Sequence, residues 1–289
     1  MNILYVTYAL DGLLMIAMPI ALGIYLTRKF HLYGQLWWIG AGVFVLSQVG
    51  HIPFNAYVVN PLLNNLNSSA ALPSIAMLIV GALILGLSAG LWEELFRYAM
   101  FRWWVKDARS WGSGLLVGTG HGGAEAIILG LLVLYNLINM IAVRNMDIST
   151  LVPADQLSAV QAQITDFWSA PWYYTLHEAL ERLFTIPAQI CFAVLVLQTF
   201  TRKQWFWVWL AVGFHALLDT ATVVAQNLLN AYLTEAIIGV FGVLSVLIIL
   251  KLRQPEPSAD PGPAAPALAP FTPKSVEETV ENLDKTRFQ

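Results

Sequence analysis

The sequence predicts an all-α fold, a polytopic membrane helical bundle with seven transmembrane helices. Hydrophobic residues make up 57% of the 289 residues and charged residues only 11%, whereas soluble domains are near 45–50% and 25%. Apolar stretches of about 20 residues, the length of a membrane-crossing helix, recur along the chain. Inside lipid the backbone must satisfy its own hydrogen bonds, so these stretches are helices. The composition excludes an ordinary soluble enzyme and a nucleic-acid-binding protein.

The membrane domain is expected to cover residues 1–253. The predicted spans are residues 4–26, 34–56, 72–101, 112–142, 175–199, 205–229 and 233–251. The first span is not a cleaved signal peptide, because it lacks a basic start, is too long and contains Asp11. The remaining residues, 254–289, are rich in proline and alanine and predict a disordered cytoplasmic tail.

The basic residues near the span ends predict the orientation. Nine of them follow the first, third, fifth and seventh spans: Arg28, Lys29, Arg102, Lys106, Arg109, Arg202, Lys203, Lys251 and Arg253. Only Arg144 lies in the connections on the other side. Lysine and arginine concentrate in cytoplasmic loops, so the N-terminus is expected outside and the C-terminus inside. The expected location is a bacterial plasma membrane.

The outer connection 143–174 contains a further helical pattern. Its apolar residues, which follow Pro153 at helical spacing, are Leu157, Val160, Ile164, Phe167 and Trp168. A short amphipathic segment beside two spans predicts a helix lying in the membrane interface.

Ionisable side chains lie inside the predicted spans, where each costs roughly 3 kcal/mol or more at mid-bilayer. The acids and arginines among them are Asp11, Glu93, Glu94, Arg97, Glu125, Glu178, Glu181, Arg182 and Asp219, and three histidines accompany them, His121, His177 and His215. If these side chains served only to hold helices together, a single ion pair would be explained. A set of this size favours a functional site.

Depth places three of these residues at one level. Glu93, His121 and His215 each lie ten residues from a tryptophan, Trp103, Trp111 or Trp205, that marks the inner interface. At 1.5 Å per residue each lies roughly 15 Å deep. Spans 3, 4 and 6 are therefore expected to form one site. His177 and Glu181 lie nearer the outer face and are expected to form a separate pair, unless Pro187 breaks the fifth span and redirects it.

The adjacent carboxylates of Glu93 and Glu94 offer a base in a low-dielectric environment. A carboxylate there can take a proton from water. Arg97, one turn further on, would keep one of the two ionised, and His121 could share the proton transfer or orient the water. The residues alone do not decide which glutamate is the base.

His215 and Asp219, four residues apart on one helical stripe, could serve a developing oxyanion. The imidazole would supply a donor, and the carboxylate would fix its orientation. Together with the glutamates they predict a hydrolytic site that activates water without a covalent nucleophile. The second tier of candidate residues is Glu125, His177, Glu178, Glu181 and Arg182.

Four segments carry a family resemblance. WEELFRY (92–98), GTGHGGAEAI (118–127), HEALER (177–182) and FHALLD (214–219) resemble the YhfC family of membrane peptidases, which is related to the CAAX-protease and bacteriocin-processing clan of glutamic intramembrane endopeptidases. The resemblance covers about residues 1–253. It implies a water-activating Glu93 with Glu94 and Arg97, its partner His121, and an oxyanion-binding pair of His215 and Asp219. Two residues separate Glu94 from Arg97 where the clan has three, and Val117 stands where the clan has phenylalanine.

Three functions follow from these residues. The first is an intramembrane endopeptidase of the glutamic type, without a cofactor, acting on a membrane-embedded or lipid-anchored peptide. The second is a metal-dependent membrane hydrolase, because histidine and carboxylate are standard ligands of a divalent ion. The third is a proton- or ion-coupled transporter, since intramembrane acids and histidines also form relays.

Overall fold

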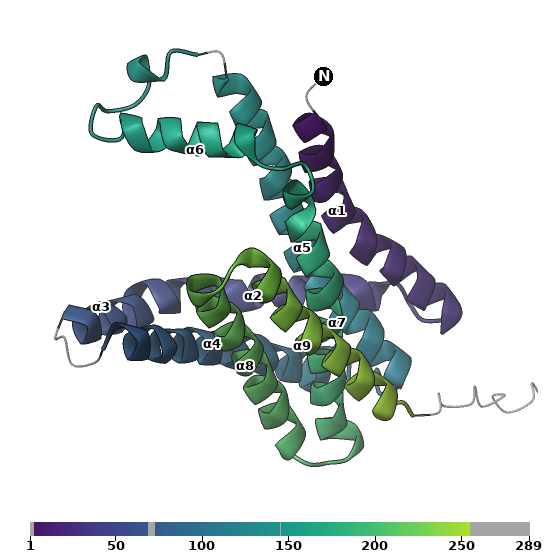
Figure 1. Ribbon diagram of the computed structural model, residues 1–289. Helices are drawn as coiled ribbons and strands as arrows, with labels where there is room; N and C mark the ends of the chain where they lie inside the picture. The colour runs from purple at the N-terminus through teal and green to yellow at the C-terminus, as the bar shows by residue number, and fades with distance from the viewer. Residues whose placement is uncertain (1–2, 69–72, 145, 255–289) are drawn as a thin grey trace, which may run out of the picture. The chain divides into compact units, whose positions relative to one another are not determined.

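The computed structural model describes residues 3–68, 73–144 and 146–254, and the chain is helical nearly throughout them (Figure 1). These ranges contain no β-strand, which confirms the all-α fold class. The main helices are α1 (Ile3–Lys29), α2 (Gln35–Phe54), α3 (Asn60–Ser68), α4 (Ser74–Ala99), α5 (Trp111–Val143), α6 (Leu157–Ser169), α7 (His177–Thr201), α8 (Phe206–Leu228) and α9 (Ala231–Lys251). The predicted tail, apart from Gln254, lies outside the described residues.

Seven helical segments within the described ranges are long and apolar enough to cross a membrane, which confirms the predicted number of spans. The second is longer than expected and runs from residue 35 to residue 68. A π-helical turn, Asn55–Val59, joins α2 to α3 immediately before Pro61. The prediction stopped at residue 56 because the asparagine-rich segment that follows is too polar to read as membrane-spanning.

Helices α5 and α7 lie at the centre of the bundle (Figure 1). Helix α5 contacts α1, α2 and α7, and α7 also contacts α1, α4, α8 and α9. Two glycines of α5 allow this packing. A Cβ atom on Gly120 would lie 1.9 Å from the carbonyl oxygen of Trp37, and one on Gly118 would lie 2.5 Å from the Cα of Ile190. Small residues at such crossings let helix backbones approach closely in membranes.

Helices α4 and α8 form a second close pair. A Cβ atom on Gly90 would lie 2.8 Å from the carbonyl oxygen of Val212, so only glycine fits without a shift. Gly90 precedes Glu93 by one turn, and Val212 precedes His215 by one turn. The close crossing therefore brings the two candidate segments side by side.

The predicted interfacial segment is helix α6, which packs on the N-terminal part of α1. The ring of Phe167 stacks on that of Tyr8 at 4.2 Å, and the Tyr8 hydroxyl donates to the Phe167 carbonyl oxygen at 3.3 Å. Asp11, further along α1, accepts a hydrogen bond from the backbone N–H of Ala179 at 2.8 Å. Asp11 thus caps the first turn of α7, which gives this intramembrane acid a structural role.

Candidate active site

Glu93, on α4, faces side chains from three other helices. Its Oε2 atom is 2.9 Å from Nε2 of His121 on α5 and 4.0 Å from Nε2 of His215 on α8. Its Oε1 atom accepts a hydrogen bond from Nε2 of Gln48 on α2 at 3.0 Å. One carboxylate oxygen is thus held by an amide, and the other faces two imidazoles.

Glu94 has different surroundings from its neighbour. Its Oε1 atom accepts hydrogen bonds from the guanidinium of Arg97 and, at 2.8 Å, from Nδ1 of His215. Arg97 also donates to Oε1 of Gln189, and its side chain is fully buried. The guanidinium neutralises Glu94 directly, while it lies 3.7 Å from Oε2 of Glu93.

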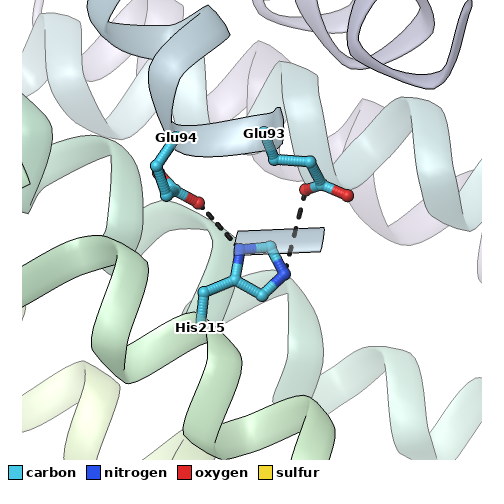
Figure 2. A group of neighbouring side chains, drawn as sticks. All are labelled: Glu93, Glu94 and His215. Carbon is cyan, nitrogen blue, oxygen red and sulfur yellow. Dashed lines mark hydrogen bonds and ion pairs between the residues drawn. The ribbon is translucent and has the colours of Figure 1, made fainter. Parts of the chain in front are cut away.

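His215 lies between the two glutamates, with one ring nitrogen toward each (Figure 2). Asp219, one turn further along α8, places Oδ2 3.6 Å from Nε2 of the same ring. The ring stacks on Phe192 of α7, with centroids 4.6 Å apart, which fixes its plane. The structure therefore brings together all six residues of the predicted site.

A cavity of about 130 Å³ adjoins the site on the side of Asp219. It is lined by His215, Asp219, Glu125, Glu181, Arg182 and Gln189, together with apolar and threonine side chains. The volume is large enough for several water molecules. The Asp219 side chain is 35% exposed, whereas those of Glu93 and His215 are 8% and 3% exposed.

The second-tier residues divide into two groups. Arg182 donates to Glu125 at 2.6 Å and also pairs with Glu181, so these three form the far wall of the cavity. His177 pairs instead with Glu235 of α9 at 3.1 Å, and Glu178 is exposed. Glu181 was expected to form a separate pair with His177. The structure places it beside the site, because α7 directs it toward α5.

Three residues that contact the candidate residues were not predicted from the sequence. Gln189 donates to Glu125 at 3.0 Å, lies 3.5 Å from Oε2 of Glu93 and thus links the two acidic groups. Gln48 is the neutral counterpart on α2. Both are amides, so the pattern of charges does not indicate them. Glu235 is an acid inside the seventh span, and a complete count of intramembrane acids would have found it.

The donor atoms at the site fit a divalent metal ion. Glu93, Glu94 and His215 are all buried, and one ligand atom from each lies within 4.8 Å of the others. Ligands that bind one zinc ion at 2.0–2.2 Å lie about 3.3 Å apart in tetrahedral geometry. Oε2 of Glu94 is buried without a hydrogen-bond partner among the described residues, which leaves this oxygen available to such an ion.

The net charge of the site is also compatible with a bound divalent cation. Three carboxylates, Glu93, Glu94 and Asp219, face a single guanidinium, that of Arg97. With neutral imidazoles they leave two negative charges, which a divalent cation would balance. The guanidinium near Glu93 opposes a cation, but its shortest contact is with Oε1 of Glu94. The residues present therefore fit the ion.

Fold and site define a class of protein, a polytopic membrane protein with a buried cluster of carboxylates and histidines suited to hydrolysis. Residues 14–252 match the family described as YhfC intramembrane metalloprotease, and the chain belongs to this family. It is 28% identical over 251 residues to the "Uncharacterized membrane protein YhfC" of Bacillus subtilis (strain 168), a match that covers 85% of this chain and 95% of the relative. No solved structure matches the chain. Family membership confirms the resemblance and supports intramembrane proteolysis as the general activity.

Proposed function

We propose that the chain is an intramembrane endopeptidase in which Glu93 activates the attacking water. The observation that carries the proposal is the position of Glu93 Oε2, which faces Nε2 of both His121 and His215. Glu94 is the poorer base, because its direct ion pair with Arg97 stabilises the ionised carboxylate. The proposed substrate is a membrane-embedded or lipid-anchored peptide, as the location of the site in the bundle suggests.

The first proposed step is deprotonation of water. Glu93 Oε2 takes a proton from a water molecule that His121 helps to orient, and the resulting hydroxide attacks the carbonyl carbon of the scissile peptide. A positioned carboxylate base contributes about 10²–10⁴-fold to such a step. The cavity beside the site, which His215 and Asp219 line and Glu93 does not, offers room from which water would reach Glu93.

The second proposed step stabilises and collapses the tetrahedral intermediate. His215 would donate from Nε2 to the oxyanion while its Nδ1–H stays bonded to Glu94, and Asp219 lies 3.6 Å from Nε2. The C–N bond then breaks, and the proton held by Glu93 passes to the leaving amine. Atoms and charge balance without a covalent enzyme intermediate.

The family description favours a metal-dependent version of the same reaction. Glu93, Glu94 and His215 would hold the ion, which when bound supplies Lewis-acid polarisation and acidifies water. In that version His215, with Nδ1–H donating to Glu94, offers the lone pair of Nε2 as a ligand. Nε2 of His215 is therefore a proton donor in the glutamic version and a metal ligand in the metal-dependent version.

A cleavage screen tests the peptidase. Wild type and Glu93→Gln would be reconstituted in liposomes with candidate membrane-tethered peptides, and the products identified by mass spectrometry. We expect cleavage by wild type and loss of cleavage in Glu93→Gln. Glu178→Gln, a change of an exposed acid on α7, is the matched control and should cleave like wild type. Equal cleavage by Glu93→Gln would remove Glu93 as the base.

Elemental analysis separates the two versions. A stoichiometric metal that purifies with wild type and is lost in His215→Ala would establish the metal-dependent version. Metal-free wild type that still cleaves in the presence of a chelator would establish the glutamic version. The same preparations should be tested for uptake coupled to a pH gradient, which the transporter alternative requires.

A further inference from the structure

A row of polar side chains leads away from Glu93 along α2 and returns to α4. Gln48 Nε2 contacts Glu93 Oε1 at 3.0 Å, and Gln48 Oε1 contacts His51 Nδ1 at 3.1 Å. His51 Nε2 contacts Asn55 Nδ2 at 2.9 Å, and Asn55 Oδ1 contacts the Ser88 hydroxyl at 2.7 Å. We call Gln48, His51, Asn55 and Ser88 the α2 polar chain.

Chemistry fixes the direction of every hydrogen bond in the α2 polar chain. Ionised Glu93 only accepts, so the Gln48 amide donates to it, and the Gln48 oxygen must accept from His51 Nδ1–H. The neutral ring then accepts at Nε2 from the Asn55 amide, and the Asn55 oxygen accepts from the Ser88 hydroxyl. All donors point toward Glu93, and hydrogen bonds aligned in one direction polarise and strengthen one another.

The local backbone supports this arrangement. Residues 48, 51 and 55 are spaced by three and four positions, so they lie on one face of the helix. Asn55 is the first residue of the π-helical turn that continues α2, and such turns are frequent at functional sites. Ser88 is 5% exposed and lies on α4 five residues before Glu93. The α2 polar chain therefore begins and ends at α4 and links the two helices.

From this geometry we infer that Gln48 and His51 are positioning residues for Glu93. They hold its Oε1 atom and so direct Oε2 to the reacting water and to His121. The inference rests on the proposed function, since it concerns the same carboxylate. Neither residue contacts the reacting atoms in this scheme; each acts through Glu93.

The competing interpretation is adhesion between helices. Polar side chains between membrane helices also serve to hold them together, at about 0.6 kcal/mol per hydrogen bond on average. Adhesion requires only that α2 and α4 stay packed. Positioning requires in addition that a donor reaches Gln48 Oε1, whichever side chain supplies it.

The kinetic test uses two substitutions at one position. His51→Leu removes the donor, and we expect kcat to fall about 10–100-fold with KM within about twofold, because a misplaced catalytic group costs rate. His51→Asn keeps an amide donor near the position of Nδ1 and should recover most of kcat. Trp111→Phe, which removes the 3.1 Å bond from α5 to the Ile249 carbonyl of α9, is the matched control and should keep wild-type kcat. Equal kcat in His51→Leu and wild type, or no recovery in His51→Asn, would overturn the inference.

A spectroscopic arm keeps this test separate from that of the peptidase. The infrared carboxylate band of Glu93 can be assigned by its loss in Glu93→Gln. We expect the band to shift in His51→Leu and to return in His51→Asn, whether or not a cleaved peptide has been found. An unshifted band in His51→Leu would contradict positioning, whereas unchanged cleavage in Glu93→Gln would contradict the peptidase proposal.

Discussion

Two acid–histidine pairs in this protein have nearly the same N···O separation and different surroundings, and of the two only Glu93 and His121 are hydrogen-bonded. Glu93 and His121 are 2.9 Å apart, and Glu235 and His177 are 3.1 Å apart. Around the first pair, a second histidine and further acids converge from α4 and α8. The second pair lies at the end of α7 beside half-exposed tyrosines, with Tyr174 stacked on the histidine at 5.3 Å. A pair alone does not make a candidate site; convergence of several helices on one oxygen does.

Arg97 pairs with Glu94, next to the Glu93–His121 pair. Removing it is expected to have the largest effect on stability. Arg97→Met leaves Glu94 buried without its cation, and breaking a buried ion pair costs about 3–5 kcal/mol. The free energy of unfolding in detergent should fall by that amount. Lys106→Met removes an exposed cation from a loop and should leave stability unchanged. Equal stabilities would show that Arg97 does not hold the site.

The two histidines test the difference in function between the pairs. His215→Ala removes the proposed oxyanion donor and should lower kcat about 10²–10³-fold, the usual cost of losing one such donor. His177→Ala should change kcat by less than about threefold, because its ring pairs with Glu235 outside the site. Both rates come from the same liposome cleavage assay. A larger loss in His177→Ala would reverse the assignment of the two regions.

Asp11, an intramembrane acid outside both pairs, is expected to stabilise the fold by capping α7. Asp11→Ala removes the cap of α7 and should lower the free energy of unfolding by about 1 kcal/mol, a common cost for a lost cap. Asp11→Asn keeps an oxygen that can accept from the Ala179 N–H and should lose less. Thermal unfolding in detergent measures both. Equal losses would show that the negative charge, rather than the hydrogen bond, is what α7 requires.

Much of this arrangement could be predicted from the sequence. Apolar length indicated the seven helices, and the equal depth of Glu93, His121 and His215 predicted that three spans meet. Helix rotation was harder to predict, because it depends on packing of glycines such as Gly90 and Gly120 against backbone atoms of distant helices. Glu181 was therefore assigned to the wrong neighbour.

The neutral members of the network could not be predicted in the same way. Gln48 and Gln189 cost less in lipid than charges do, so their presence in a span is a weaker signal. Their roles depend on which atoms face Glu93, and that follows only from the relative positions of α2, α4 and α7. The predicted orientation, with the N-terminus outside, is set by loop charges and stays a prediction.

One conservative substitution at each acid–histidine pair tests most directly whether the active site is centred on Glu93. Glu93→Gln and Glu235→Gln remove the same charge from two acid–histidine contacts of similar length, and both can be assayed for cleavage of one membrane-tethered peptide. Our interpretation predicts that cleavage falls at least about 10²-fold in Glu93→Gln and stays close to wild type in Glu235→Gln. Retained cleavage in Glu93→Gln, or equal losses in both variants, would contradict a site centred on Glu93.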